Sequence, residues 1–595
     1  METNIKTRSE IDDKYKWDLS SLFKDKKEYD AAYKEVFKLV LEVIKFKGHI
    51  MTDKLYDFYK MYEKLDRLSD RVFMYARLIC DTDTSDSNGQ KMKMQAQKMG
   101  EIISDKLSFV TPEMLNCNYD DVLKLIDKDS RLEEYRFDLE KMFRYKDHTL
   151  SEKEEAIITK ASNAFGTGDE AFYNLDNSDI NLGKIKDEDG NLVELTNSNY
   201  GKYMTSLNRE VRIDAFNHMY KYFKGLKNTL AACLKGNIKE NFFISDVKKF
   251  ESPLEMSLYS DSIDVSVYKN LINTIHDNMD AMYDYMALRK KALGLDEMHM
   301  YDLHVDLIKE KQKDIDFDEG KKIIFEALKP LGNKYLNDLE KAFSEKWIDI
   351  YPSKGKRSGA YSWGCYDSYP YLLLNYNDTI DSVNTMIHEL GHSMHSYYSK
   401  SQNYIDHNYP IFLAEIASTV NEVLLNSYLY KNAETKEEKI LYLTEFLDKV
   451  RTTIYRQTMF AEFEMIMHDK EANGVPLTEE EFSNTYYELN KLYYGDNVVS
   501  DEDIRYEWSR IPHFYTSFYV YKYATGLSSA IAIASDILEG KEGAVDKYIE
   551  FLSSGGSNYP LNILKRTGVD MTKPEPIIKS INMFREKLEE LKKLI

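Results

Sequence analysis

The sequence predicts a mainly α-helical protein with two lobes. Its 595 residues include only 25 Gly and 11 Pro, so few residues interrupt a helix. Apolar side chains recur at steps of three and four residues through most of the chain, which is the spacing of helices with one buried stripe. A chain of this length can bury a large core and usually divides into two or more domains or lobes. It contains no repeat of fixed period, no heptad run and no low-complexity linker.

Two regions depart from the helical pattern. Lys184–Lys186 and Leu192–Leu195 flank an Asp189-Gly190 turn, which predicts a β-hairpin. A small sheet is predicted within residues 346–376, where Tyr369–Tyr376 reads as a short apolar strand. The β content is therefore expected to be small and local.

The boundary between the lobes is placed just after the hairpin. Residues 196–199 offer N-cap side chains for a helix that continues from Tyr200. This gives an N-terminal helical lobe of residues 1–198 and a C-terminal lobe of residues 199–595.

The composition restricts the class of partner. The formal net charge is −21, so nucleic acid and anionic membrane surfaces would repel the protein. No stretch approaches eighteen apolar residues, and residues 1–10 lack the apolar core of a signal peptide, so we expect a cytosolic protein. The four cysteines are widely spread and are expected to be reduced thiols. The sequence has no marker of oligomeric state.

The segment Met386–His392 contains the pattern His-Glu-x-x-His. His388 and His392 are four residues apart, so on a helix they share one face and can bind the same metal ion. Glu389 is rotated by one residue, which places its carboxylate beside the open coordination position. There it can accept a proton from a water that the metal activates. The pattern is typical of a hydrolytic zinc site.

The residues around this pattern favour a helix packed on a core. Apolar residues recur at helical spacing, namely Val383, Ile387, Leu390 and Met394. Candidates for the N-cap and for first-turn acids are Asn377, Asp378 and Asp381. Gly391 inside the helix costs about 1 kcal/mol relative to alanine, which indicates close approach of another backbone.

A catalytic zinc site needs a third protein ligand. The pattern with a third histidine requires a glycine at position 395 and a histidine at position 398. This chain has His395 and Tyr398 there, so it does not fit that pattern. The best candidate is Glu415, in the first turns of a helix that starts at Pro410. Asp406, in a polar loop, is a weaker candidate. In addition, Glu422 shares the face of Glu415 and can hydrogen-bond a ligand on the side away from the metal. His395 is expected to support a ligand in the same way or to pack, rather than to bind the metal.

Several separated segments together resemble oligoendopeptidase F, within the thimet oligopeptidase-like M3 family of zinc metallopeptidases. The main ones are Gly359–His395, Phe412–Glu422 and Ile511–Gly526. The resemblance also reaches both ends of the chain, at Trp17–Ser20 and Phe551–Ser557. It implies one zinc ion per chain bound by His388, His392 and Glu415, with Glu389 as general base and acid. It also implies that residues 1–198 include the N-terminal region of the family.

The resemblance directs attention to the aromatic run after Pro512. In this family a histidine and tyrosines from that region hydrogen-bond the oxygen that becomes negative during peptide hydrolysis. His513 matches the histidine. For the tyrosines, Tyr519 and Tyr523 are preferred because they lie one helical turn apart. The alternatives are Tyr515 and Tyr521.

The expected fold is therefore a helical peptidase with a zincin-like core, a deep substrate channel and a small sheet beside the zinc helix. The resemblance implies that extended oligopeptides reach the metal, whereas folded proteins do not. Pairing of the substrate backbone with the Gly359–Ser362 region would give broad specificity for internal peptide bonds.

Two other functions stay open at this stage. One is a related exopeptidase, a dipeptidase or carboxypeptidase, which needs a basic residue for a terminal carboxylate. Available residues are Arg357, Arg505 and Arg510. The other is a non-catalytic helical binding protein in which the metal pattern is accidental.

Overall fold

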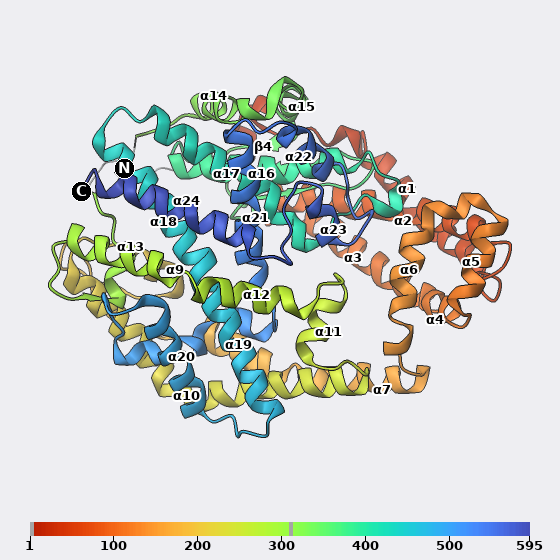
Figure 1. The fold of residues 1–595 in the computed structure, drawn as a ribbon. Helices are drawn as coiled ribbons and strands as arrows, with labels where there is room; N and C mark the ends of the chain where they lie inside the picture. Colours follow the sequence, from red (N-terminus) through yellow and green to blue (C-terminus); the bar gives the residue numbers. More distant parts are fainter. Residues whose placement is uncertain (1–4, 309–312) are drawn as a thin grey trace. The chain divides into compact units, whose positions relative to one another are not determined.

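The computed structural model describes residues 5–308 and 313–595. Helices make up most of this chain, as expected (Figure 1). No helix among the described residues combines the length and the apolar composition needed to cross a bilayer.

Contacts divide the chain into two compact units, each built from several segments. The first comprises Met1–Asp147, Gln312–Tyr428 and Ile533–Gly568, and the second comprises His148–Lys311, Leu429–Ala532 and Val569–Ile595. This division follows contacts rather than chain order. The boundary expected at residue 198 stays a prediction about the organisation of the sequence.

The first unit contains the helices of residues 26–144, the helix that carries the His-Glu-x-x-His pattern and the start of the helix that carries Glu415. Its helices are α1 (Lys26–Ile44), α2 (Leu55–Thr82), α3 (Ser87–Leu107), α4 (Val110–Leu115), α5 (Tyr119–Lys128), α6 (Arg136–Arg144), α14 (Phe317–Ala327), α15 (Gly332–Ser344), α16 (Ile380–Ser399), α22 (Ala544–Leu552) and α23 (Pro560–Lys565). Helix α17 (Ile411–Asn432) begins in this unit.

The second unit is built around one very long helix, α10 (Arg209–Val247). Its other helices are α7 (Glu152–Phe165), α8 (Thr167–Asn177), α9 (Asn197–Met204), α11 (Pro253–Tyr259), α12 (Val265–His276), α13 (Met279–Ala292), α18 (Lys436–Val450), α19 (Arg456–Ala472), α20 (Glu479–Tyr494) and α24 (Glu575–Lys592). Helix α21 (Tyr521–Leu538) begins here, and the 3₁₀ segment η10 (Glu502–Arg510) packs on α10 and α20.

The predicted hairpin is confirmed. Strands β1 (Lys184–Lys186) and β2 (Leu192–Glu194) pair antiparallel, with Ile185 opposite Val193. Gly190 in the turn has φ of 83°, a left-handed conformation that glycine adopts without strain. The side chain of Thr196, one of the expected capping residues, caps the following helix α9, which starts at Asn197 rather than at the expected Tyr200.

The predicted small sheet is also confirmed, in the first unit. Its order is β4 (Ile348–Asp349), β6 (Tyr371–Leu373) and β5 (Tyr361–Trp363), with β6 parallel to β4 and antiparallel to β5. The regular strand is shorter than the predicted 369–376: it starts at Tyr371, after Pro370, which has no N–H to donate to a ladder, and it ends at Leu373. Strand β5 lies at an edge of this sheet and contacts α16.

The segment Trp17–Ser20 near the start of the chain packs on the core of the first unit. Trp17 packs edge-on against Tyr371 of β6, with ring centroids 6.0 Å apart. The Tyr371 hydroxyl donates to the carbonyl of Asp18 at 2.7 Å. The Trp17–Ser20 segment thus supports the sheet that lies beside α16.

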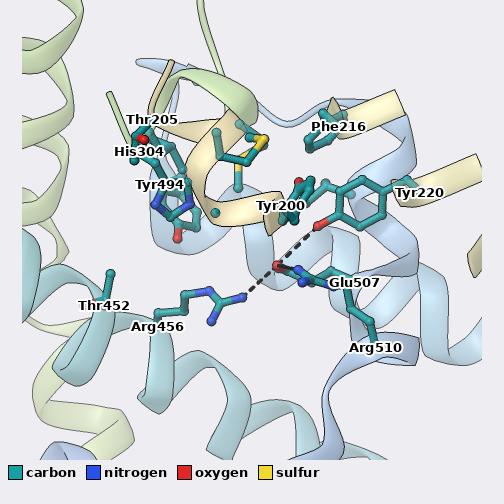
Figure 2. A pocket seen from close by; sticks show the side chains of 15 residues that line it. Tyr200, Thr205, Phe216, Tyr220, His304, Thr452, Arg456, Tyr494, Glu507 and Arg510 are labelled. Carbon is teal, nitrogen blue, oxygen red and sulfur yellow. Dashed lines mark hydrogen bonds and ion pairs between the residues drawn. The ribbon is translucent and has the colours of Figure 1, made fainter. Parts of the chain in front are cut away.

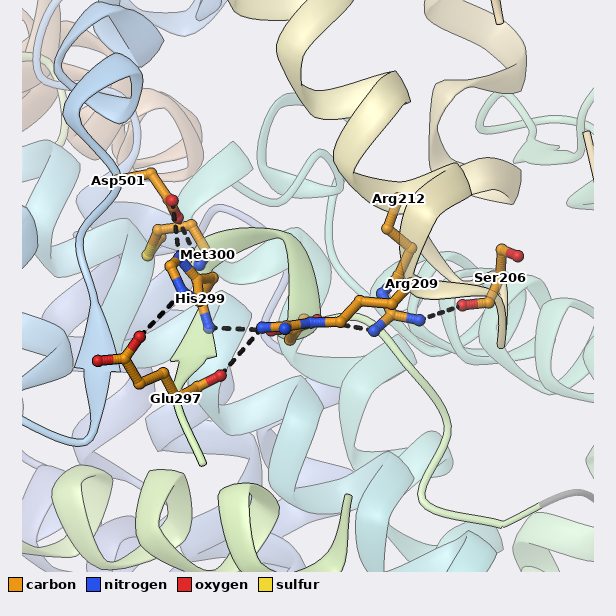
Figure 3. Close-up of polar contacts among 8 residues, drawn as sticks. Ser206, Arg209, Arg212, Glu297, His299, Met300 and Asp501 are labelled. Atoms are coloured by element: carbon orange, nitrogen blue, oxygen red, sulfur yellow. Dashed lines mark hydrogen bonds and ion pairs between the residues drawn. The ribbon is translucent and has the colours of Figure 1, made fainter. Parts of the chain in front are cut away.

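A buried ion-pair network fixes α10 to the short parallel pair β3 (Met298–His299) and β7 (Val498–Val499). Asp302 is fully buried, and Arg209 and Arg212 each bind it at 2.8 and 2.7 Å. Burial alone would raise the pKa of Asp302, but hydrogen bonds from the two guanidiniums outweigh burial and hold this pKa below its ordinary value. Asp501 receives the backbone N–H of Met300 at 3.0 Å (Figure 3).

Candidate active site

The metal pattern lies on α16, as expected, but its N-cap differs from the candidates. Thr379 is the N-cap, and its side chain accepts a hydrogen bond from the N–H of Ser382 at 3.2 Å. Asp378 has φ of 55°, and its carbonyl accepts from Ile315, so it lies outside the capping position. Capping by Asn377 or Asp378 was therefore the wrong prediction, whereas Asp381 is the expected first-turn acid.

His388, His392 and Glu415 form one group of potential metal ligands within the first unit. The Nε2 atoms of the two histidines are 3.2 Å apart. Oε2 of Glu415 lies 3.5 Å from Nε2 of His388 and 3.4 Å from Nε2 of His392. The three atoms thus form a nearly equilateral triangle.

The size of this triangle fits zinc. A tetrahedral zinc ion with bonds of about 2.0–2.1 Å separates adjacent ligand atoms by about 3.3–3.4 Å. Two imidazoles and one carboxylate are also a donor set of catalytic zinc sites, which leave a fourth position open. The hydrogen bond with His392, against the opposing effect of burial, lowers the pKa of Glu415 to about 2. Glu415 is therefore a carboxylate, the form that binds a cation.

Glu389 lies beside this triangle and is nearly buried, with 9% of its surface exposed. Burial raises the pKa of Glu389, while the neighbouring His388 and His392 act in the opposite direction. The backbone of Ser362 in β5 lies near this carboxylate and contributes to lowering its pKa. The same serine contacts α16 a second time, through a 2.8 Å hydrogen bond with Ser393. The edge strand therefore holds the carboxylate in place.

Gly391 allows α16 and α17 to touch. A Cβ atom at this position would lie 2.5 Å from Cα of Ser418 and 2.9 Å from the carbonyl oxygen of Ala417. The expected close approach of another backbone is confirmed. Asn421 adds a buried hydrogen bond from its amide to the carbonyl of Ile387 at 3.2 Å. This contact fixes the distance between the histidines on α16 and the glutamate on α17.

Two further contacts orient the ligands. Glu422 Oε1 lies 2.9 Å from Nδ1 of His388, the ring nitrogen that faces away from the triangle. This is the outer contact expected of Glu422 from its position on the helix. Ser418 donates to Oε2 of Glu415 at 3.1 Å, a contact that the sequence analysis missed. The sequence feature that predicts this hydrogen bond is the three-residue spacing between Glu415 and the hydroxyl residue Ser418.

The other candidates near the pattern have different roles. Asp406 ends a short 3₁₀ turn, η8 (Tyr404–Asp406), and does not belong to the ligand group. His395 is fully buried and stacks on Tyr409 with ring centroids 3.6 Å apart. Burial lowers the pKa of His395 to about 3, so the imidazole is neutral and packs as an apolar ring. The expectation that His395 packs is confirmed.

His513, Tyr519 and Tyr523 gather in the second unit. The Tyr523 hydroxyl lies 3.3 Å from Nε2 of His513. The ring centroids of Tyr519 are 6.5 Å from His513 and 5.4 Å from Tyr523. All three side chains are partly exposed. Burial and the charge of Arg456 lower the pKa of His513, so its ring is neutral and offers one N–H donor.

The alternative tyrosines belong to the packing of the same unit. Tyr515 stacks on Phe172 with ring centroids 4.4 Å apart. Tyr521 is buried and packs on Tyr268 at 5.2 Å. The geometry thus groups His513 with the two preferred tyrosines rather than with these two.

The three arginines considered for a terminal carboxylate have different surroundings. Arg357 pairs with Asp81 at 3.3 Å, and Arg505 pairs with Glu502 at 2.8 Å. Arg510 instead lines a cavity of the second unit.

Comparison with known proteins agrees with this geometry. The model of peptidase family M3 matches residues 202–583, and the model described as oligopeptidase F matches residues 113–181. The chain belongs to peptidase family M3. It is a metalloendopeptidase of that family.

Similar proteins cover almost all of the chain. Oligopeptidase PepF of Bacillus subtilis is 41% identical over 99% of this chain and 88% of its own length. Group B oligopeptidase PepB of Streptococcus agalactiae is 37% identical over 99% of this chain and 98% of its own. The crystal structure of oligoendopeptidase-F from Enterococcus faecium has a TM-score of 0.73 at 32% identity and covers 96% of this chain and 99% of its own.

A candidate peptidase from Chlamydophila abortus has a crystal structure with a TM-score of 0.94 at 35% identity, and each chain covers 100% of the other. The resemblance drawn from the separated sequence segments is therefore confirmed.

Proposed function

We propose that this M3 peptidase is a zinc enzyme that hydrolyses internal bonds of short oligopeptides. The supporting observation is the triangle of His388, His392 and Glu415, whose atom spacing matches tetrahedral zinc. These residues would hold one ion per chain. When bound, zinc would polarise a water and the scissile carbonyl, and it lowers the pKa of such a water toward about 7.

Glu389 moves the proton in this proposal. Its carboxylate accepts a proton from the attacking water and returns it to the nitrogen of the leaving amine. The raised pKa that burial gives Glu389 suits this role, since a carboxyl that titrates closer to neutral pH both accepts and donates more readily. Ser362 and β5 keep the carboxylate from turning away.

His513, Tyr519 and Tyr523 are proposed as donors to the oxygen that becomes negative. Support comes from their grouping and from the neutral state of His513, in which one ring N–H is available. Preorganised donors of this kind lower the barrier most where little water is present.

The edge strand β5 is proposed to pair with the substrate backbone. It lies at the edge of the three-stranded sheet and next to the helix that carries Glu389. Pairing through main-chain atoms reads no side chain, so broad sequence preference follows. A cytosolic location and a lobe boundary at residue 198 complete the proposal.

The deciding experiment compares purified parent protein with Glu389→Gln on an internally quenched peptide blocked at both ends. We expect the parent to cleave an internal bond and to lose activity on chelation, with recovery when zinc is restored. Glu389→Gln should retain zinc and lose nearly all activity. Failure of the parent to cut the blocked peptide while it trims free peptides would favour an exopeptidase, and a lack of zinc binding would refute the site.

A further inference from the structure

A cavity of about 450 Å³ lies within the second unit, and Arg510 is one of the residues that line it. Apolar side chains form part of its wall, including Met204, Phe216, Leu303 and Ile504. Arg456, Arg510 and Glu507 supply its charged groups (Figure 2). A volume of this size is enough for one or two amino-acid residues of a ligand.

The charges of the cavity do not balance. Arg456 Nη2 lies 2.7 Å from Oε1 of Glu507, whereas the nearest nitrogen of Arg510 is 3.7 Å from the same oxygen. Burial alone would raise the pKa of Glu507, but the two guanidiniums outweigh burial and hold this pKa below its ordinary value. Glu507 is therefore anionic. Two cations facing one anion leave one positive charge. The nearby imidazole of His304 adds none, because burial lowers its pKa to about 3.

Both carboxylate oxygens of Glu507 already accept hydrogen bonds from residues other than Arg510. Its Oε1 also accepts from the Tyr220 hydroxyl at 3.3 Å, and its Oε2 accepts from the Tyr486 hydroxyl. Arg510 lies over the ring of Tyr200 at 5.2 Å, and among the described residues it donates no hydrogen bond to another side chain or carbonyl. A guanidinium carries five N–H donors. Arg510 therefore presents open donors to the cavity.

Buried hydrogen bonds fix the part of the cavity wall that contains Thr205 and Met300. Arg212 donates to the carbonyl of Ser206 at 2.6 Å and to Asp302 at 2.7 Å, which holds the chain beside the lining residue Thr205. The backbone of Met300, another lining residue, is held by Asp501 (Figure 3). These buried contacts indicate that the cavity exists before a ligand enters.

A π-helical turn, η9 (Arg451–Tyr455), precedes Arg456 at the start of α19. Thr452 of this turn lines the cavity together with Arg456, four residues later. A π turn inside a helix is rare and is frequent at functional sites. Here the π turn directly precedes Arg456 and forms part of the cavity wall beside its guanidinium.

Apolar walls with one unbalanced guanidinium suit a carboxylate attached to an apolar group. A carboxylate brings one negative charge and accepts two parallel hydrogen bonds from a guanidinium. A phosphate would bring nearly two charges against a net charge of one, so its second charge would have no cationic partner among the lining residues.

We propose that this cavity binds the C-terminal residue of a peptide substrate, with Arg510 donating hydrogen bonds to the terminal carboxylate. This inference rests on the proposed function, because it names the end of the oligopeptide that the second unit binds. Arg510 precedes His513 by three residues, so the site lies close along the chain to the proposed oxyanion donors. Peptides with a free C-terminus and an apolar last residue are the preferred substrates.

The kinetic test uses one peptide as its free acid and as its C-terminal amide. We expect amidation to raise KM about tenfold in the parent, the effect of losing one charged hydrogen-bonded contact. Arg510→Met should raise KM for the acid and abolish the difference, while Arg510→Lys should restore part of it. Arg505→Met, in the same 3₁₀ segment but outside the cavity, should behave as the parent. Equal KM values for acid and amide in the parent, or an equal rise for both in Arg510→Met, would overturn the proposal.

A binding test separates this proposal from the proposed function. N-acetyl-phenylalanine, its amide and N-acetyl-glutamate α-amide are titrated by calorimetry into Glu389→Gln, with and without Arg510→Met. Binding of the first compound alone, lost with Arg510→Met in a protein of unchanged melting temperature, supports the site even if no peptide is cleaved. Equal binding of the glutamate compound would assign the site to acidic side chains and refute the C-terminal assignment. No binding of any compound would refute the site.

Discussion

Nδ1 of His388 lies 2.9 Å from Oε1 of Glu422, so the ring nitrogen that points away from the ligand triangle has a carboxylate partner. A carboxylate in this position orients the imidazole and increases its basicity. The relationship links two helices, because His388 belongs to α16 and Glu422 to α17. It has a measurable consequence for metal affinity.

Glu422→Gln should weaken zinc binding by about 10- to 100-fold, the usual effect of removing such an outer partner. Competition with a chromophoric chelator measures the affinity. Glu101→Gln, at an exposed ion pair on α3, is the matched control and should leave it unchanged. Zinc affinity of Glu422→Gln equal to that of the parent would show that the contact does not support the ligand.

Gly391→Ala should destabilise the protein although alanine is the better helix former. The new Cβ would meet the Ser418 backbone at 2.5 Å, and overpacking of this kind costs about 1–3 kcal/mol. Gly100→Ala on α3 is the control, because nothing lies within 4 Å of its Cβ position. There the substitution should stabilise by up to about 1 kcal/mol. Melting temperatures that shift in the same direction in both variants would contradict the contact.

Tyr523→Phe should lower kcat by about 10²–10³-fold if its hydroxyl donates to the developing oxyanion. Tyr515→Phe should change kcat little, since Tyr515 stacks on Phe172. Both variants should retain the zinc content of the parent. A similar loss in the two variants would indicate disturbed packing of the aromatic run rather than the loss of a donor.

We expect Glu464 to make the stability of the second unit depend on pH. Its Oε1 accepts the backbone N–H of Phe518 at 2.9 Å, next to Tyr519, and Phe518 has φ of 60°. Burial raises the pKa of Glu464 from 4.5 to about 8, against the opposing hydrogen bond from Phe518. Between these pH values the folded state holds a proton that the unfolded state has lost. The free energy of unfolding therefore falls as pH rises.

Glu464→Gln removes this titration while its amide oxygen can still accept from Phe518. The advantage of the variant over the parent should grow from pH 5 to pH 8, by up to about 3.5 kcal/mol. Melting temperatures at the two pH values test this, with Glu471→Gln at the end of the same helix as the control. An advantage that stays constant with pH would show that Glu464 is ionised throughout.

Local patterns predicted most of the candidate site. The four-residue spacing of His388 and His392 needs only helix geometry to place both rings on one face. The Asp189-Gly190 turn needs only a left-handed glycine, and the hairpin followed. The N-cap of α16 was predicted wrongly because several polar residues precede the helix, and the chosen one depends on where the backbone bends.

The sequence by itself determined the helical class and the His-Glu-x-x-His pattern that contains the proposed base, because each depends on residues within one element. Tertiary structure decided what required two elements to meet. Gly391 indicated from the sequence that another backbone approaches α16, but only the tertiary structure shows that this backbone belongs to α17 and that the contact brings Glu415 to the histidines. Arg456 and Arg510 line one cavity because α19 and η10 meet there. Packing between elements depends on the shapes of both partners, which periodicity within either one does not describe.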